Sequence, residues 1–347
     1  FSSVPGCTGF LLLVLFTMFT LVAVYRKTLK RYQWFIYSHH AWLLLFLLII
    51  IHGSKQYLGP SSAWKFFLTP IILKAIELAR YIYQLIQQKI EIQALSYSPA
   101  ELIKLVIKKP KGFNFKPGQY VQLRIPAISK FEFHPFTIAS SPQDENITFY
   151  ISPIGDWTNK LKEIAVDSEA SKTISLNLAG PYGAPSQDYD NFDHIMLFCT
   201  GVGATPFTSI LRHLVQQHKN FQNPKHIDFY WCNRKSKNTR WIESILLDLI
   251  SESHLEFITF RFYITSAQEI YDLRSFLLWI GLEQLSQEGQ HIKDRPTDII
   301  RWGRPDLDRI FLKKQNEASG EIGVFYCGND QMAKDVSLKC NQYSSGS

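Results

Sequence analysis

Two long runs without a charged residue constrain this chain more than any other feature. They cover Phe1 to Tyr25 and Tyr32 to Ser54. Each run, as a helix rising about 1.5 Å per residue, is long enough to cross the ~30 Å hydrocarbon core of a bilayer. A third candidate, Trp64 to Gln88, contains four charged side chains and Pro70. We expect it to span the membrane too, the alternative being an amphipathic core helix.

The charge distribution predicts the orientation. Residues 26–31, RKTLKR, carry four cations, whereas the connection from Gly53 to Ala63 has only Lys55. By the positive-inside rule the basic loop is cytosolic, which places everything after about residue 90 in the cytosol. We expect an integral protein of the plasma membrane, with the lipid bilayer as a partner. The chain opens with Phe1 rather than Met, which is typical of a fragment or a processed product.

Composition gives no support to nucleic acid binding or to a cysteine metal site. The net charge of +7 fits a basic loop that faces anionic lipid, and no basic and aromatic pattern indicates nucleic acid binding. The five cysteines form no CxxC pair and have no metal-ligand spacing. A reducing compartment fits the last four, which are Cys199, Cys232, Cys327 and Cys340.

Beyond the helices, the pattern predicts two further domains. Short β-type segments at residues 103–109, 119–127, 134–142, 146–154 and 172–183 indicate an antiparallel barrel. After Asp193 strands and helices alternate, which is typical of a parallel α/β sheet. The polar stretch of residues 286–316 predicts a long loop. The expected division is helices in residues 1–88, a barrel in 89–190 and an α/β domain in 191–347.

One glycine-rich turn in the α/β part is a candidate phosphate site. CTGVGATPF, Cys199 to Phe207, follows a buried strand and opens a helix. Gly201 and Gly203 allow a tight turn, and the free amides and positive dipole end of the helix suit a phosphate. The motif is GxGxxP and lacks the third glycine of a dinucleotide fingerprint, so a structural turn is the alternative.

The neighbouring strand ends strengthen this prediction. Asn233 and Arg234 end the next strand, where a cation suits the 2′-phosphate of NADPH; a surface arginine is the alternative. Cys327 and Gly328 end the last strand, at the carboxyl edge where open α/β sheets bind ligands.

The barrel part contains a candidate flavin segment. HPFTIASSP, residues 134–142, could hold a flavin, with Phe136 against the ring and Thr137 donating toward its N5 edge. GDWTNKL, residues 155–161, reads as a helix start whose amides could receive a pyrophosphate.

Together these features resemble the ferredoxin-NADP reductase superfamily, and more closely the NADPH oxidase family. The resemblance covers nearly the whole chain and rests on the order of membrane histidines, HPFT, GDWT, GPYGAPSQDY, GVGATPF and CGND. Within the family, the chain looks most like the calcium-regulated and plant respiratory-burst branches. The resemblance implies FAD at His134, Pro135, Phe136, Thr137, Trp157 and Thr158. It implies NADPH at Gly201, Gly203, Thr205, Pro206, Arg234, Arg304, Cys327 and Gly328.

The resemblance also implies two b-type haems. A histidine in hydrocarbon is costly and usually faces a partner, although a hydrogen-bonded core histidine is the alternative for any one of them. The matching iron ligands are His39 and His52, which lie about 20 Å apart along an ideal helix. The opposite ligands would come from helices that precede Phe1. One residue departs from the family pattern: Ser152 stands where relatives commonly carry an arginine, which predicts a weaker grip on the FAD pyrophosphate.

The implied activity is electron transfer from cytosolic NADPH through FAD and two haems to molecular oxygen, giving superoxide. No side chain of this chain is assigned as a catalytic acid, base or nucleophile. A ferric-chelate reductase with the same electron path is one alternative, and a haem-free membrane-anchored nucleotide-binding module is another. Two kinds of protein partner stay open, a second copy in a homo-oligomer and a separate regulatory subunit.

Overall fold

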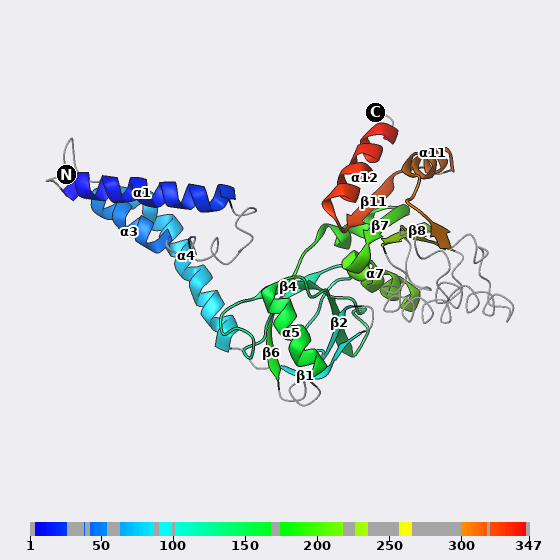
Figure 1. Ribbon diagram of the computed structural model, residues 1–347, viewed down its shortest axis with the longest axis horizontal. Helices are drawn as coiled ribbons and strands as arrows, with labels where there is room; N and C mark the ends of the chain where they lie inside the picture. Colours follow the sequence, from blue (N-terminus) through cyan, green and yellow to red (C-terminus); the bar gives the residue numbers. More distant parts are fainter. Residues whose placement is uncertain are drawn as a thin grey trace. The chain divides into compact units, whose positions relative to one another are not determined.

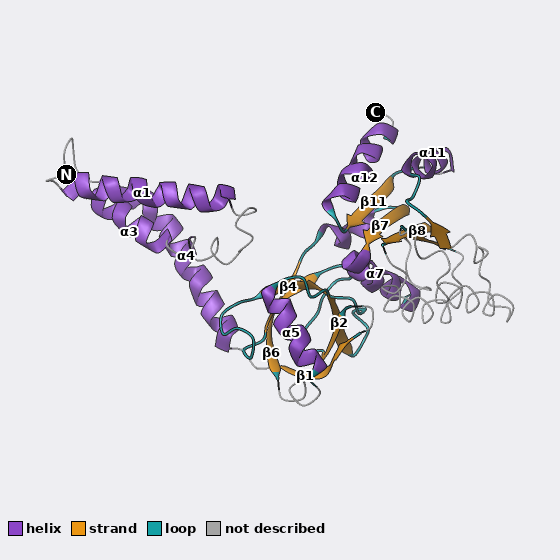
Figure 2. Ribbon diagram, in the orientation of Figure 1, coloured by secondary structure: helices purple, strands orange, loops and turns teal. Residues whose placement is uncertain are grey.

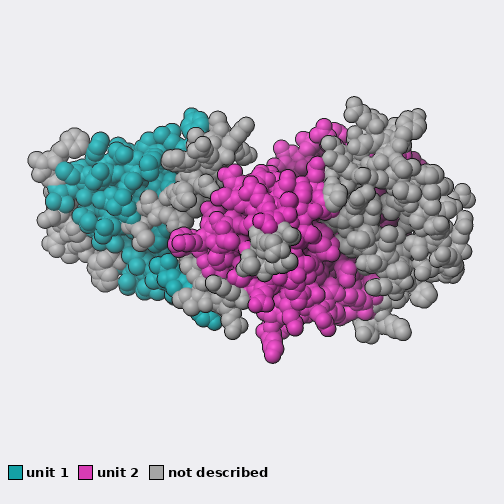
Figure 3. Space-filling model, turned by 60° about the horizontal axis from the view of Figure 1, so that its bottom comes forward, with its two compact units in different colours: residues 1–86 teal, residues 87–347 magenta. Residues whose placement is uncertain are grey.

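The computed structural model describes residues 4–25, 38, 42–53, 63–86, 90–98, 101–167, 174–217, 226–234, 257–265, 300–317 and 320–344. The chain divides into two compact units, Phe1–Ile86 and Gln87–Ser347, which Figure 3 distinguishes by colour. His39 lies outside the described residues, and so do two helices of the alternation expected after Asp193, at residues 239–251 and 271–285.

The first unit is helical. Its described helices are α1 (Val4–Tyr25), α3 (Trp42–His52) and α4 (Ala63–Ile86), and α1 and α3 run side by side (Figure 1). Phe46 of α3 packs edge-on against Phe67 of α4, with ring centroids 5.8 Å apart. Of the helices in the described ranges, α1 is the one whose length and apolar composition suffice to cross a membrane. The helix predicted near Trp64 to Gln88 is present as α4, with Pro70 inside it.

The second unit begins with a six-stranded antiparallel sheet in the order β4-β3-β6-β1-β2-β5 (Figure 2). Its strands are β1 (Ile90–Tyr97), β2 (Ile103–Lys108), β3 (Tyr120–Arg124), β4 (His134–Thr137), β5 (Asn146–Ile151) and β6 (Ser175–Tyr182). Just beyond β4, the Ala139 amide donates to the Thr148 carbonyl of β5 over 2.9 Å, which joins the two edges of the sheet. The predicted antiparallel architecture is therefore confirmed.

The barrel interior follows from period-two alternation along its strands. In β2 the side chains of Ile103, Leu105 and Ile107 are fully buried, while the alternate positions hold exposed lysines and the half-buried Val106. The same alternation buries Ile147, Phe149 and Ile151 of β5, which pairs with β2. Helix α5 (Asp156–Val166) adds Trp157 and Leu161 to this core.

A five-stranded parallel sheet follows in the order β10-β9-β8-β7-β11. Its strands are β7 (His194–Thr200), β8 (His226–Asn233), β9 (Ile258–Ile264), β10 (Ile300–Trp302) and β11 (Ile322–Cys327), and its described α-helices are α7 (Thr205–Gln216), α11 (Leu307–Glu317) and α12 (Asp330–Tyr343). The predicted parallel sheet is confirmed. The prediction of a long loop at residues 286–316 is wrong, because β10 and most of α11 lie within it.

Alternation along β7 explains why helices cover both faces of this sheet. Ile195 and Leu197 point to the face packed by α7, where Phe207 and Ile210 are buried. Met196 and Phe198 point to the other face, where they meet Phe311 of α11 and Val336 of α12. A strand buried on both faces reads as a continuous apolar run, which is why HIMLFC contains so few polar residues.

Candidate functional site

The glycine turn of the α/β part forms a short 3-10 helix, η2 (Gly201–Ala204), between β7 and α7. Gly201 has φ of +54°, a conformation that a residue with a Cβ rarely adopts. A Cβ at Gly203 would overlap the carbonyl group of Cys327 at the end of β11. The two glycines therefore act differently, since Gly201 makes the turn and Gly203 permits close approach of two backbones.

The end of β11 is tied to the end of β7. Cys327 pairs in register with Cys199, and a Cβ at Gly328 would overlap the Thr200 hydroxyl. The Thr200 hydroxyl oxygen accepts a hydrogen bond from the Asn329 amide over 3.1 Å. Burial raises the pKa of the Cys327 thiol, so this side chain is neutral at physiological pH. The structure thus brings Gly201, Gly203, Cys327 and Gly328 together at the carboxyl edge of the sheet.

Thr205 and Pro206 lie at the start of α7 and are buried. The Thr205 hydroxyl donates to the Val202 carbonyl over 3.0 Å. On the other side of the turn, the Trp231 indole N–H donates to the Gly201 carbonyl over 2.9 Å. These three side chains hold the shape of the turn, and the sequence pattern had not indicated the role of Trp231.

The two candidate arginines follow different strands. Arg234 follows β8, the neighbour of β7, and is exposed; its amide donates to the Asn233 side-chain oxygen over 2.8 Å. Arg304 is also exposed and follows β10, three strand positions from β7. At about 4.8 Å per strand, that is roughly 14 Å from the glycine turn. Both arginines lie at the carboxyl edge, but Arg304 is not adjacent to the turn.

The candidate flavin residues are divided between the two faces of β4. His134 and Phe136 share one face, because successive strand residues alternate, and Pro135 and Thr137 share the other. Both rings of the first pair meet Trp157, with centroid distances of 4.6 Å for His134 and 5.6 Å for Phe136. The structure therefore joins β4 to the start of α5 through three aromatic rings.

The start of α5 has first-turn amides without an acceptor in the helix and one buried side-chain donor. The Thr158 hydroxyl accepts hydrogen bonds from the amides of Ile154 and Gly155, each over 3.0 Å, and so caps the helix. The Trp157 indole nitrogen is buried and has no hydrogen-bond partner among the described residues. A buried N–H without a partner is costly, and an acceptor supplied by a ligand would satisfy it. Ser152 is half-buried and brings no positive charge to this helix start.

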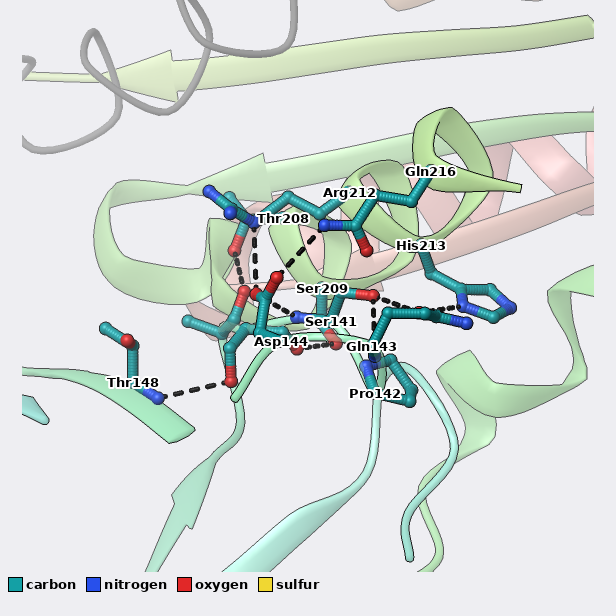
Figure 4. Close-up of polar contacts among 12 residues, drawn as sticks. Ser141, Pro142, Gln143, Asp144, Thr148, Thr208, Ser209, Arg212, His213 and Gln216 are labelled. Atoms are coloured by element: carbon teal, nitrogen blue, oxygen red, sulfur yellow. Dashed lines mark hydrogen bonds and ion pairs between the residues drawn. The ribbon is translucent and has the colours of Figure 1, made fainter. Parts of the chain in front are cut away.

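A seam of polar contacts connects the barrel to α7 (Figure 4). The Ser209 hydroxyl donates to the Ser140 carbonyl over 2.7 Å. Asp144 accepts from the Ser141 amide over 2.9 Å and pairs with Arg212 over 3.4 Å. Paired serines after HPFT were the available signal, but sequence reasoning missed this seam. It fixes the helix that starts at the glycine turn against the segment that follows β4.

In the helical unit, the predicted iron ligand His52 is the last residue of α3. Its Nδ1 lies 3.0 Å from the Thr8 hydroxyl oxygen of α1. Among the described residues, no three His, Cys, Asp or Glu side chains are grouped as a metal site. A haem iron would need only one imidazole from α3, so a cluster of three metal-ligating side chains is not required.

Two family models match the chain. The FAD-binding domain covers residues 87–186, and the ferric reductase NAD binding domain covers residues 192–341. A crystal structure of a ferredoxin NADP+ reductase from Neisseria gonorrhoeae with bound FAD and NADP shares the fold, with a TM-score of 0.52 at 14% identity over 75% of this chain and 92% of that one. The fold and site define a two-domain reductase that binds a flavin and a nicotinamide nucleotide.

Individual proteins similar to this chain are oxidases. The chain is 30% identical to a superoxide-generating NADPH oxidase heavy chain of Dictyostelium discoideum, over 99% of this chain and 51% of that protein. It is also 30% identical to dual oxidase 1 of Sus scrofa, over 98% of this chain and 22% of that protein. Nearly the whole chain is thus similar to NADPH oxidases and dual oxidases, and it spans between a fifth and a half of the length of these relatives.

Proposed function

We propose that this chain is the electron-transferring part of a membrane NADPH oxidase that passes electrons from cytosolic NADPH through FAD and two b-type haems to molecular oxygen, producing superoxide. One observation carries the proposal. Similarity to a superoxide-generating oxidase covers 99% of the chain, so it includes α1, α3 and α4 as well as the reductase domains. The proposed division is helices in residues 1–88, FAD domain in 89–190 and NADPH domain in 191–347. The boundary of the compact units at residues 86 and 87 supports it.

We assign the NADPH site to the carboxyl edge of the parallel sheet. The turn at Gly201 and Gly203 offers backbone amides to a pyrophosphate, with Thr205 and Pro206 fixing the turn. Arg234, one strand away, would neutralise a 2′-phosphate. Arg304 would contact a more distant part of the nucleotide, since it is about 14 Å away along the sheet. The neutral Cys327 thiol and the adjacent Gly328 would border the nicotinamide.

The FAD site is assigned to β4 and the start of α5. The first-turn amides of α5, which have no acceptor within the helix, and the Trp157 indole N–H fit the acceptor groups of a bound FAD. Pro135 and Thr137 would meet the flavin from one face of β4, while His134 and Phe136 on the other face pack against Trp157 and would brace the site. Bound FAD would convert a two-electron hydride donor into the single-electron steps that haem requires.

His39 and His52 are the proposed haem ligands. The donor set fits, because neutral imidazole is a common ligand of haem iron. In the described part of this unit, the Nδ1 of His52 has a partner on α1, and no hydrogen bond to its Nε2 is present. The bis-histidine arrangement would be completed by residues outside this chain.

A ferric-chelate reductase is the second candidate, and one observation favours it: the matching NAD-binding model is that of ferric reductases. The full-length protein in membranes should distinguish the two. Given NADPH and oxygen, the oxidase reduces cytochrome c in a reaction that superoxide dismutase abolishes. Dismutase-insensitive reduction of a ferric chelate, without superoxide, would contradict the proposed acceptor.

A further inference from the structure

Helix α1 has one buried side chain along its whole length, and that side chain is polar. Apolar residues of α1 such as Leu13, Phe16 and Val24 are exposed, while Thr8 is only 7% exposed. The burial of Thr8 arises where α1 packs against α3, at the imidazole of His52. Next to Thr8, Gly9 leaves room for that ring, since a Cβ there would lie 3.2 Å from the His52 Cε1.

The hydrogen bonds of Thr8 favour one tautomer of His52. The Thr8 hydroxyl donates its single proton to the Val4 carbonyl over 2.8 Å, with the Pro5 carbonyl at 3.3 Å. With its proton on that carbonyl, the same oxygen is left to accept in its 3.0 Å contact with Nδ1 of His52. A neutral imidazole that donates from Nδ1 has its lone pair on Nε2.

Two other threonines of α1 show that the contact with His52 is specific to Thr8. Thr17 and Thr20 donate to the carbonyls of Leu13 and Phe16, each over 2.8 Å. Both are bonds to the residue four positions earlier, as in Thr8. Neither has an imidazole at its oxygen in the described structure. The bond to the previous turn is thus ordinary in α1, and only Thr8 adds the second interaction.

We propose that Thr8 is a positioning residue that orients the imidazole of His52 and keeps its Nε2 available for haem iron. This rests on the proposed role of His52 as a ligand. Histidine ligands commonly donate their other N–H to a protein acceptor, which fixes the tautomer and raises ligand basicity. Loss of such a partner typically weakens metal binding or activity by about 10- to 100-fold. A less basic ligand also stabilises ferric iron less, so the midpoint potential of that haem rises.

The experiment compares three variants of the full-length protein in membranes. Thr8→Val removes the hydroxyl, Thr8→Ser retains it, and Thr17→Val is the matched control on the same helix. We expect Thr8→Val to raise the potential of one haem in a spectroscopic redox titration and to weaken its retention by about tenfold or more. Thr8→Ser should restore both properties, and Thr17→Val should change neither. Thr8→Ala should reproduce the shift if Thr8→Val does not assemble.

Two results would overturn the inference. The first is an unchanged potential in both Thr8→Val and Thr8→Ala, and the second is an equal shift in Thr8→Ser or Thr17→Val. His52→Leu separates this failure from failure of the proposed function. If His52→Leu loses one haem while the Thr8 variants keep the wild-type potential, His52 is a ligand and Thr8 does not position it. If His52→Leu keeps both haems, both the ligand assignment and the inference fail.

Discussion

Helices α1 and α7 are both rich in apolar residues, but only α7 buries them. In α7, residues from Thr205 to Leu211 are all buried, and Phe207 and Ile210 fill a core beneath the parallel sheet. In α1 the apolar side chains are exposed or half-buried, and the one buried side chain is Thr8. A helix that shows apolar side chains outward and polar ones inward is suited to lipid as its solvent. Apolar content therefore predicted a helix in both places, but only burial shows which solvent each one requires.

The largest expected effect concerns the reductase unit, where a buried charge needs an oppositely charged partner. Lys314 Nζ lies 2.6 Å from a carboxylate oxygen of Asp228, and both side chains are nearly buried. Lys314→Met would leave that carboxylate without its cation and lower the free energy of unfolding by about 3–5 kcal/mol. Thermal unfolding of the full chain in detergent measures this.

The neighbouring lysine is the control for this prediction. Lys313 pairs with Glu317 at 3.6 Å on the exposed side of α11. Lys313→Met should change stability by no more than about 1 kcal/mol, because exposed pairs contribute little. Equal losses in the two variants would show that burial does not set the energetics of α11.

The next effect concerns the approach of the glycine turn to β11. Gly203→Ala places a methyl group on the Cys327 carbonyl and forces the two backbones apart. Overpacking of this kind is expected to destabilise the turn by about 1–3 kcal/mol. If that cost falls on the bound state, NADPH affinity drops by roughly 10- to 100-fold. Titration of the full-length protein with NADP+ measures the affinity. Gly155→Ala, whose Cβ would meet no atom within 4 Å, should leave it unchanged.

A pH dependence follows from the same buried carboxyl. Burial alone would raise the pKa of Asp228, but the hydrogen bond from His226 and the charge of Lys314 outweigh it and hold the pKa below its ordinary 3.8. A carboxyl whose folded pKa is depressed stabilises the fold above its unfolded value, and this stability is lost as pH falls through the folded pKa. We expect stability to fall below about pH 4, by up to about 1.4 kcal/mol per pH unit. Asp228→Asn should reduce this slope, and an unchanged slope would assign it to other carboxyls.

The smallest effect concerns the seam between the barrel and α7. Asp144→Asn keeps an oxygen for the Ser141 amide but removes the ion pair with Arg212. The pair is partly exposed, so a loss of about 0–1 kcal/mol in stability is expected. Glu145→Gln, one residue away, should lose nothing measurable. A loss of several kcal/mol in Asp144→Asn would mean that the charge, rather than the hydrogen bonds, holds α7 in place.

Sequence patterns predicted the fold where they were periodic. Alternation in β2 and β5 and the apolar runs of β7 and β8 placed these strands correctly. The central strand β1 was not singled out, because IEIQALSY has few strong turn signals around it. The short β10 and the charged α11 were read as a loop, since neither has a strong apolar period.

The sequence predicted which residues belong to the candidate sites, but not which other residues they contact. Gly203 and Cys327 were each selected from the sequence, yet only the structure shows that they meet. Trp157 was expected at a pyrophosphate, and only the structure shows that its ring packs against His134 and Phe136. Thr8 drew no attention, because a threonine in an apolar helix is ordinary until its partner is known. Long-range pairing of this kind leaves no local signal.

The most direct test of the account uses the spectrum of the full-length protein, reduced by NADPH without oxygen. We expect b-type bands that appear on NADPH addition, with one of the two haems lost in His52→Leu. Absence of such bands in the wild-type protein, or two intact haems in His52→Leu, would contradict an electron path from the nucleotide edge to an iron held by α3.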